Sequence, residues 1–400
     1  MMRWVAGGVT AARGFMASGI SAGIKPSRRP DLALVVSRHP AAAAAVFTTN
    51  RIKAAPVVIS QRRLRRRQAR AVLINSGCAN CLTGEAGLRD AQRLSRLVAR
   101  GIGLADHEIL LASTGLIGTR LPVVRVERAI PRLLGSLNRQ QHEEAAWAIL
   151  TTDRHPKEAA VSVAVRGGMF HVGGMAKGAG MIAPSMATML CVMTTDVAAP
   201  QPLLRRLLRQ ASAATFNRIS VDGDMSTNDT VFLLANGRSG VQLRAGASSV
   251  PVFATALQAV AQRLARMLVA DGEGASRLME VVVSGARSAH EARLCARAVV
   301  TSPLVKTMLA GGDANVGRIA AAVGASPARF DPDALDIRIQ DQRVVAKGRV
   351  VPLPASVVRT LLRRPSVAVR IDLHAGRAED RMTTCDFTTD YVRINAGYAT

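Results

Sequence analysis

Aromatic residues are scarce in this chain. Phe, Trp and Tyr make up 3% of its 400 residues, whereas hydrophobic residues of all kinds make up 48%. The core must therefore be built mainly from aliphatic side chains, as in many globular proteins. Long apolar runs are also lacking, because none reaches the roughly 18 uncharged residues that a spanning helix needs. We therefore expect no membrane span.

Cysteine is sparse as well. The five cysteines are odd in number and widely spaced, a pattern that does not form a disulfide framework and that fits a reducing cytoplasm. Cys78 and Cys81 have the spacing of a redox or zinc motif. No second pair or histidine cluster completes such a site, so we expect no metal.

Lysine occurs only six times, at positions 25, 53, 157, 177, 306 and 347. Because Lys and Arg together number 53, the net charge of +25 is carried almost entirely by arginine, which is typical of a genome-wide compositional bias. The densest run, Arg62–Arg70, is expected to be a solvated turn or helix. No aromatic side chains alternate with it to stack on bases, so we expect no nucleic-acid function. The positive field would still attract anionic substrates.

A chain of 400 residues is longer than one that usually folds around a single hydrophobic core, so two or more domains are expected. Strands and helices alternate in the hydrophobic pattern, which indicates an α/β fold. Apolar runs predict strands at 32–36, 71–74, 160–165 and 189–193, and helical spacing predicts helices over 88–98, 203–211 and 253–268. A C-terminal unit is expected to run from a strand at 281–284 through helices over 289–300 and 315–323, and then through strands to the end.

A glycine-rich loop, Lys177–Pro184, leads to a small residue, Ala187, and then to Thr188. A cut between Ala187 and Thr188 would place a nucleophilic hydroxyl and a base, the freed α-amine, on one residue. The pKa of an α-amine is about 7.7–8.0, so a useful fraction is neutral near pH 7. On these residues alone, a structural threonine opening a buried strand is the more common arrangement.

Other short motifs are spread along the chain: GVTAARGF (8–15), AGIK (22–25), FTTN (47–50), NSG (75–77), STGLIG (113–118), TTDRHPKEA (151–159), KGAGMIAPSMATML (177–190), FNRISVDGD (216–224), STND (226–229), DGEG (271–274), SPLVKT (302–307) and YVRINAGYAT (391–400). In this order they resemble the ornithine acetyltransferase, or glutamate N-acetyltransferase, family. Its members are self-cleaving enzymes of arginine biosynthesis.

The resemblance implies a layered αββα-type sandwich core with a smaller C-terminal α/β domain. It also implies self-cleavage into residues 1–187 and 188–400, the second comprising the rest of the core, 188–280, and the C-terminal domain, 281–400. The implied reaction moves the acetyl group of N2-acetyl-L-ornithine to L-glutamate through an acetyl-threonine intermediate. No cofactor is implied, and acetyl-CoA as a second acetyl donor stays open. Family members assemble as α2β2 heterotetramers.

The resemblance also assigns site residues. Thr188 would be the nucleophile, Thr114 and Gly115 the oxyanion hole, and Ala187 and Thr188 the cleavage junction. The residues expected to bind substrate are Thr151, Lys177, Thr188, Glu273, Asn395 and Thr400. Lys177 offers a positive charge to a substrate carboxylate, and Glu273 offers a negative charge to an ammonium group. Thr152 could exchange roles with Thr151.

Two alternatives stay open on the sequence. One is a relative with the same N-terminal threonine chemistry and another acyl substrate, including an amidase. The other, from a different class, is a non-catalytic basic binding protein. The chain departs from the usual family pattern at Ser185, Met225, Ala314 and Val316, which leaves the substrate preference and the rate of cleavage open.

Overall fold

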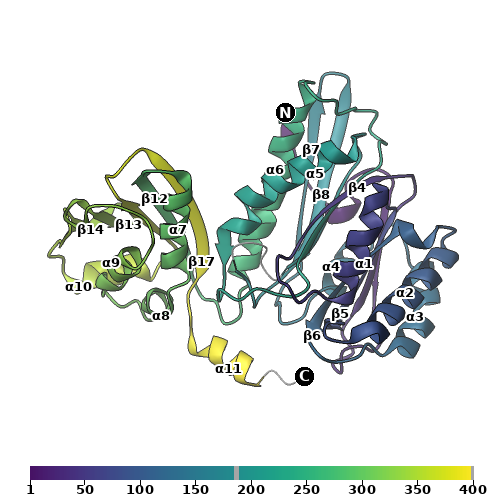
Figure 1. Cartoon of the computed structure of the whole chain (residues 1–400), viewed down its shortest axis with the longest axis horizontal. Helices are drawn as coiled ribbons and strands as arrows, with labels where there is room; N and C mark the ends of the chain where they lie inside the picture. The colour runs from purple at the N-terminus through teal and green to yellow at the C-terminus, as the bar shows by residue number, and fades with distance from the viewer. Residues whose placement is uncertain (184–188, 398–400) are drawn as a thin grey trace.

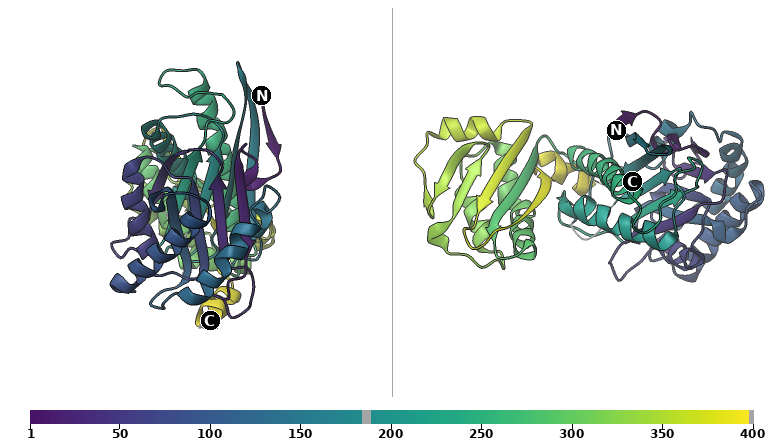
Figure 2. Two further views of the ribbon diagram at one scale, coloured as in Figure 1. Left: turned by 90° about the vertical axis from the view of Figure 1, so that its right-hand side faces the viewer. Right: turned by 90° about the horizontal axis from the view of Figure 1, so that it is seen from above.

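Figure 1 shows the computed structural model of the chain, which describes residues 1–183 and 189–397. These residues form a sandwich of two sheets and a C-terminal unit built around a third sheet. Figures 1 and 2 show the C-terminal unit beside the sandwich, joined to it at one end.

The larger sheet of the sandwich has the strand order β1-β7-β8-β9-β11-β4. Its strands are β1 (Met2–Val5), β7 (Lys157–Val165), β8 (Gly168–Lys177), β9 (Leu190–Thr195), β11 (Thr230–Ala235) and β4 (Ala42–Phe47). Neighbours are antiparallel except β9 and β11, which are parallel, with Leu190 opposite Thr230. Strand β9, predicted at 189–193, is therefore confirmed as a central strand, and every residue in it is buried.

The smaller sheet of the sandwich has the order β2-β3-β5-β6. Its strands are β2 (Phe15–Ile20), β3 (Leu32–Ser37), β5 (Ala71–Cys78) and β6 (Ile109–Leu116). Strands β5 and β6 are parallel, so their carboxyl ends meet at one edge, with Gly77 opposite Gly115.

Helices cover both outer faces of the sandwich. Helices α5 (Gln201–Ala214) and α6 (Ser249–Ala270) share a hydrophobic cluster with the larger sheet. On the smaller sheet lie α1 (Ala55–Arg63), α2 (Gly84–Gly101) and α3 (Val123–Gly135). Between the sheets lies a third cluster, which includes Phe15, Ile74 and Phe232, together with the alanines of α4 (His142–Ala148). This layering confirms the expected αββα sandwich.

The C-terminal unit has the strand order β10-β17-β12-β16-β13-β14-β15. Its strands are β10 (Ile219–Ser220), β12 (Leu278–Ala286), β13 (Asp336–Ile339), β14 (Gln342–Ala346), β15 (Arg349–Val350), β16 (Ser366–Asp372) and β17 (Ala378–Cys385). Its helices are α7 (Ala289–Val300), α8 (Pro303–Gly311), α9 (Gly317–Gly324), α10 (Ala355–Leu362) and α11 (Thr389–Gly397). Its hydrophobic cluster is separate and starts at Met279, while β10 from the sandwich segment pairs with β17.

The expected strands and helices over 32–36, 71–74, 88–98, 160–165, 203–211 and 253–268 are each confirmed within a few residues. The expectation of strands to the end of the chain was wrong, because α10 and α11 interrupt and follow them. The departures Ala314 and Val316 pack on the C-terminal cluster. The proposed borders at 187, 280 and 281 stay predictions. Among the residues that the structure describes, no helix is both long and apolar enough to cross a membrane.

The arginine run 62–70 is not solvated throughout. Arg63, the last residue of α1, is buried. Its guanidinium donates hydrogen bonds to Ser95 Oγ at 2.9 Å, to Asp106 Oδ2 at 2.7 Å and to the carbonyl of Ile109. It thereby ties α1 to α2 and to the start of β6. A buried arginine with three hydrogen-bond acceptors is a structural element that composition could not distinguish from its exposed neighbours.

We expect Arg63→Ala to lower the free energy of unfolding by about 2 kcal/mol, because buried acceptors lose a charged donor. Arg62→Ala, which changes the exposed neighbour, is the matched control and should cost under about 0.5 kcal/mol. Urea denaturation followed by circular dichroism measures both. Equal effects of the two substitutions would show that the Arg63 contacts contribute nothing.

Candidate active site

Lys177, the last residue of β8, is the centre of a buried polar cluster. Its side chain is 3% exposed, and Nζ lies 2.7 Å from Thr151 Oγ1 and 3.5 Å from Thr114 Oγ1. Thr151 follows α4, and Thr114 lies near the end of β6. Three of the predicted site residues, from three separate segments, therefore meet around one ammonium group.

Asp153 supplies the countercharge to this cluster. Its Oδ2 lies 3.5 Å from Lys177 Nζ, and its Oδ1 accepts from Lys157 Nζ at 2.7 Å and from the Gly178 N–H at 2.6 Å. Burial opposes ionisation of Asp153, but the charges of Lys177 and Lys157 and the hydrogen bonds from Lys157 and the Gly178 N–H outweigh it and hold its pKa well below the usual range. Asp153 is therefore a permanent anion behind Lys177.

The charge chain continues beyond Lys157. Lys157 Nζ also donates to Asp271 Oδ2 at 2.6 Å, and Asp271 accepts from Arg154 Nε at 3.2 Å. Asp271 follows α6, so the chain of alternating charges joins β7 and β8 to the segment that carries Glu273. Side chains of Asp153, Lys157 and Asp271 are each at most 7% exposed.

Gly115 has a conformation that only glycine adopts easily. Its φ is +127°, and a Cβ there would collide with the backbone of Gly77 on the neighbouring strand β5. The close approach shapes the carboxyl end of β6, where Thr114 and Gly115 were predicted to form the oxyanion hole. The structure places Thr114 beside Lys177, so a hydroxyl and a cation lie together at this edge.

Glu273 and Asn395 form a second pair of predicted residues. Asn395 Nδ2 donates to Glu273 Oε2 at 2.8 Å, while the Glu273 N–H donates to the carbonyl of Ala179. A Cβ on Gly180 would lie 2.5 Å from Glu273 Oε2, so the loop after Lys177 runs directly over this carboxylate. Glu273 therefore contacts the loop that follows Lys177.

Helix α11 is fastened to the segment that carries Glu273. Thr388 Oγ1 donates to the carbonyl of Gly274 at 2.7 Å, and Asp386 accepts from the N–H groups of Ser276 and Arg277 at 2.8 and 3.0 Å. Buried Lys306 donates to Thr384 Oγ1 at 2.7 Å and to the carbonyl of Cys385. These contacts fix the direction in which the chain enters α11 and so bring Asn395 to Glu273.

Carboxylates hold both described ends of the loop that contains the proposed junction. Asp222 accepts from the N–H groups of Met181 and Ile182 at 2.6 and 2.9 Å. Asp229 Oδ1 accepts from the Met189 N–H at 3.1 Å. Burial raises the pKa of Asp222 to about 6 and that of Asp229 well above its usual range, although hydrogen bonds from backbone N–H groups oppose both shifts.

A cavity of about 520 Å³ opens beside Thr151. Lys25, Gly77, Leu116 and Arg120 are among its lining residues. Lys25 Nζ donates to the carbonyl of Pro30 at 2.8 Å, and burial lowers its pKa to about 8 despite the charge of Asp31. The cavity is large enough for a small amino-acid derivative and presents cationic groups to a carboxylate.

The structure thus brings together Thr114, Gly115, Thr151 and Lys177, and separately Glu273 and Asn395, with the loop after Lys177 between the two groups. Thr152 lies next to Thr151 but has no contact with Lys177 among the described hydrogen bonds. The predicted residues Ala187, Thr188 and Thr400, and the departure Ser185, lie outside the described residues. Met225 accepts at its carbonyl from Asn50 Nδ2 at 3.3 Å.

Sequence reasoning missed Lys25, Asp153, Lys157, Asp271 and Asp229 as members of the site. Lysine scarcity was a usable signal: three of the six lysines, Lys157, Lys177 and Lys306, are buried and hydrogen-bonded. Because nearly all other basic residues of this chain are arginine, a buried lysine indicates a narrow position that suits the compact ammonium group. Cys78 and Cys81 are both buried and unpaired.

Comparison with known proteins gives a consistent result. The sequence model of the ArgJ family matches residues 16–400. The chain is 46% identical over 402 residues to the arginine biosynthesis bifunctional protein ArgJ of Symbiobacterium thermophilum, and 42% identical over 413 residues to the glutamate N-acetyltransferase of Methanocaldococcus jannaschii. Each alignment covers 100% of both chains. These findings confirm the resemblance found in the motifs.

Two solved structures are similar in part. A chain of ArgJ from Bacillus halodurans is 36% identical, with a TM-score of 0.48, and the match covers 51% of this chain and 97% of that one. A chain of the ornithine acetyltransferase of Mycobacterium tuberculosis, solved in complex with ornithine, is 40% identical, with a TM-score of 0.44; the match covers 48% of this chain and 100% of that one.

We expect Asp153→Asn to lower the free energy of unfolding by about 3 kcal/mol or more, because two buried ammonium groups lose their shared anion. Asp90→Asn is the control, since Asp90 forms an ion pair with Arg120, which is 64% exposed, and should cost less than about 1 kcal/mol. Chemical denaturation at pH 7 measures both. A loss at Asp153 no larger than at Asp90 would mean that the charge chain is not coupled to the fold.

Asp222→Asn should change the pH dependence of stability. Because the pKa of Asp222 rises from its ordinary 3.8 to about 6 on folding, the native state holds this proton more tightly than the unfolded state between these values. Stability from this group is therefore lost as pH rises through 6. We expect the melting temperature of Asp222→Asn, relative to the unsubstituted protein, to increase between pH 4 and pH 7. A difference that stays constant with pH would contradict the shift.

Proposed function

The chain belongs to the ArgJ family, and from this we propose that it is a glutamate N-acetyltransferase of arginine biosynthesis. It moves the acetyl group of N2-acetyl-L-ornithine to L-glutamate. Besides family membership over the full length, the observation that carries the proposal is the convergence of Lys177, Thr151 and Thr114 beside the loop that leads to the junction. Such a cluster suits a reaction in which negative charge develops on an acyl oxygen.

The first step is self-cleavage. Thr188 Oγ attacks the carbonyl carbon of Ala187, the C–N bond breaks, and the proton of the hydroxyl passes to the freed amine. Water then hydrolyses the resulting ester, which leaves Ala187 as a carboxylate and Thr188 as a new N-terminus. Asp222 accepts a hydrogen bond from the backbone before the junction and Asp229 accepts one from the backbone after it, and these bonds support this step because they restrict the loop on both sides.

Acetyl transfer follows in the same site. Thr188 Oγ, with the α-amine as its base, attacks the acetyl carbonyl of N2-acetylornithine, and ornithine leaves with the proton on its amine. The α-amine of glutamate then attacks the acetyl-threonine ester, which forms N-acetylglutamate and restores the hydroxyl. Thr114 and Gly115 supply the oxyanion hole, where loss of one donor typically costs about 10²–10³ in rate.

The charges of the substrates are complementary to the charges of the two groups of residues. Lys177 is already paired with Asp153, so its remaining role is to orient Thr151 and Thr114 and to face a developing anion. Lys25, at the cavity beside Thr151, is a second cation available to a substrate carboxylate. Glu273, held by Asn395, offers its carboxylate to the side-chain ammonium of ornithine. Thr400 completes the substrate contacts in this proposal.

Further parts of the proposal concern assembly and donors. The cleaved chains associate as an α2β2 heterotetramer in the cytoplasm, and no metal or other cofactor takes part. Acetyl-CoA as an additional acetyl donor would make the enzyme bifunctional, as the name of the Symbiobacterium relative indicates for that protein. The second candidate function is an amidase with the same nucleophile, and the acceptor distinguishes the two: glutamate for the transferase, water for the amidase.

We expect intact mass and N-terminal sequencing of the purified protein to give two fragments, the second beginning Thr188-Met-Leu-Cys. Thr188→Ala should abolish both cleavage and acetyl transfer, because the hydroxyl is lost. Thr188→Ser keeps a hydroxyl and should retain part of each activity. The assay follows acetylglutamate formed from N2-acetylornithine and glutamate. A single uncut chain of 42.2 kDa with full transferase activity would refute the mechanism.

A further inference from the structure

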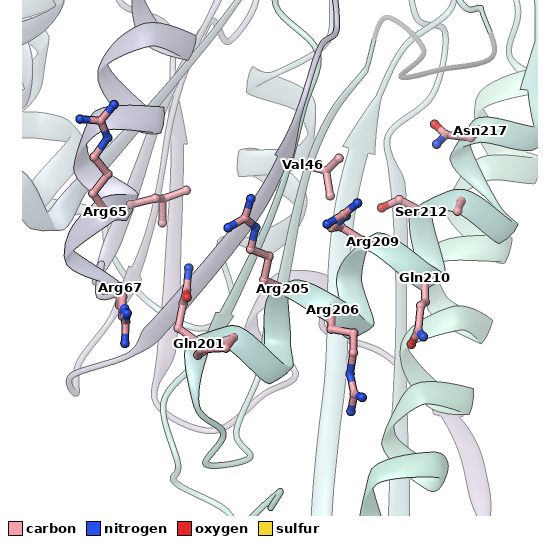
Figure 3. A pocket seen from close by; sticks show the side chains of 13 residues that line it. Val46, Arg65, Arg67, Gln201, Arg205, Arg206, Arg209, Gln210, Ser212 and Asn217 are labelled. Atoms are coloured by element: carbon pink, nitrogen blue, oxygen red, sulfur yellow. The ribbon is translucent and has the colours of Figure 1, made fainter. Parts of the chain in front are cut away.

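A groove of about 940 Å³ lies between α5 and the turn that follows α1, over the edge strand β4 (Figure 3). Five arginines line it: Arg65 and Arg67 on one wall, and Arg205, Arg206 and Arg209 on α5. In Figure 3, Arg205 and Arg209 extend from α5 toward β4, whereas Arg206 points the other way. Among the residues that the structure describes, none of those assigned to the proposed active site lines the groove.

The groove carries no countercharge of its own. No Asp or Glu is among its lining residues, and none of the five arginines forms an ion pair within 1–183 and 189–397. A second arginine-lined groove, between α2 and α3, differs in this respect. There Arg93 Nη2 donates to Glu127 Oε2 at 2.7 Å, and both residues line the groove. Arg93 therefore has a carboxylate partner among the lining residues of that groove, which the arginines of the α5 groove lack.

Two features of the residues that line the α5 groove are energetically unfavourable. Arg205 and Arg209 are four residues apart on α5, and like charges at this spacing destabilise a helix by a few tenths of a kcal/mol. Arg67 has a left-handed backbone with φ 65°. Its N–H donates to the Leu64 carbonyl at 3.0 Å and its carbonyl accepts from the Ala43 N–H at 3.2 Å, so the turn is held in this conformation.

An unpaired buried hydroxyl lies at the groove as well. Ser212, 1% exposed, is a further lining residue on α5, and its Oγ has no hydrogen-bond partner in the part of the chain that the structure describes. A buried hydroxyl without a partner is costly and calls for an explanation. An anion in the groove would supply an acceptor, after a small rearrangement of the side chains that cover it.

We propose that this groove binds a small oligophosphate, a molecule with two or three linked phosphoryl groups. Guanidinium groups form paired, charge-assisted hydrogen bonds with phosphate oxygens. Cations on two opposite walls suit an extended chain of charges better than a single compact anion. The phosphoryl chain could belong to inorganic polyphosphate, to a nucleoside triphosphate or to coenzyme A, which share this chemistry.

Isothermal titration calorimetry of the purified full-length protein with inorganic tripolyphosphate tests the site. The double substitution Arg205→Gln/Arg209→Gln should weaken binding about tenfold or more, because each lost charged hydrogen bond is substantial. Arg359→Gln/Arg363→Gln, an exposed pair with the same spacing at the end of α10, removes the same charge and should change the affinity less than about twofold. Ser212→Ala should weaken binding without lowering thermal stability.

Several outcomes would overturn the site: no binding of tripolyphosphate to the unsubstituted protein at millimolar concentration, or equal weakening by the two double substitutions. If the Ser212→Ala variant binds tripolyphosphate as tightly as the unsubstituted protein, the Ser212 hydroxyl is not part of the site. Parallel titrations with ATP and coenzyme A identify the source of the phosphoryl chain. Tight binding of a DNA duplex that depends equally on both arginine pairs would indicate general polyanion attraction instead. Unchanged circular dichroism of each variant shows that folding is intact.

Discussion

A buried chain of alternating charges is the constraint on which the rest of the site depends. It runs from Lys177 through Asp153 and Lys157 to Asp271, and each of these groups is removed from water. A charge in the interior persists only with a partner at hydrogen-bonding distance, so each member fixes the position of the next. Such a chain adds little net stability compared with a well-packed apolar core, but it determines where Lys177 and Thr151 lie.

The charge chain also links distant parts of the sandwich. Asp153 precedes β7, Lys177 ends β8, and Asp271 follows α6, so the two sheet strands and the helix cannot shift independently. Glu273 lies two residues beyond Asp271 and is held by Asn395 of α11. The C-terminal helix is therefore connected to Lys177 through these polar contacts and the short backbone segment from Asp271 to Glu273, although most of the third sheet lies apart from the sandwich (Figure 2).

The sequence predicted the elements whose hydrophobic pattern is strong. Strand β9 is a continuous apolar run, and α6 has apolar residues at helical spacing on its buried face. Helix α11 was missed because none of its residues is buried, so no apolar period marks it. Arg63 was assigned to solvent because composition does not show that Asp106 and Ser95 surround it. The pairing of Lys157 with Asp271 could not be predicted either, since 114 residues separate the two partners.

Strand order in the larger sheet has a consequence for a chain divided after residue 187. Strands β9 and β11 would belong to the second fragment, yet they lie between β8 and β4 of the first. The two fragments would thus interlock, with ladders of backbone hydrogen bonds on both sides of the inserted pair. Separating the fragments would require breaking the sheet, so the two fragments would unfold together as one cooperative unit. Thr114 and Glu273, which belong to different fragments, would thus keep their relative positions.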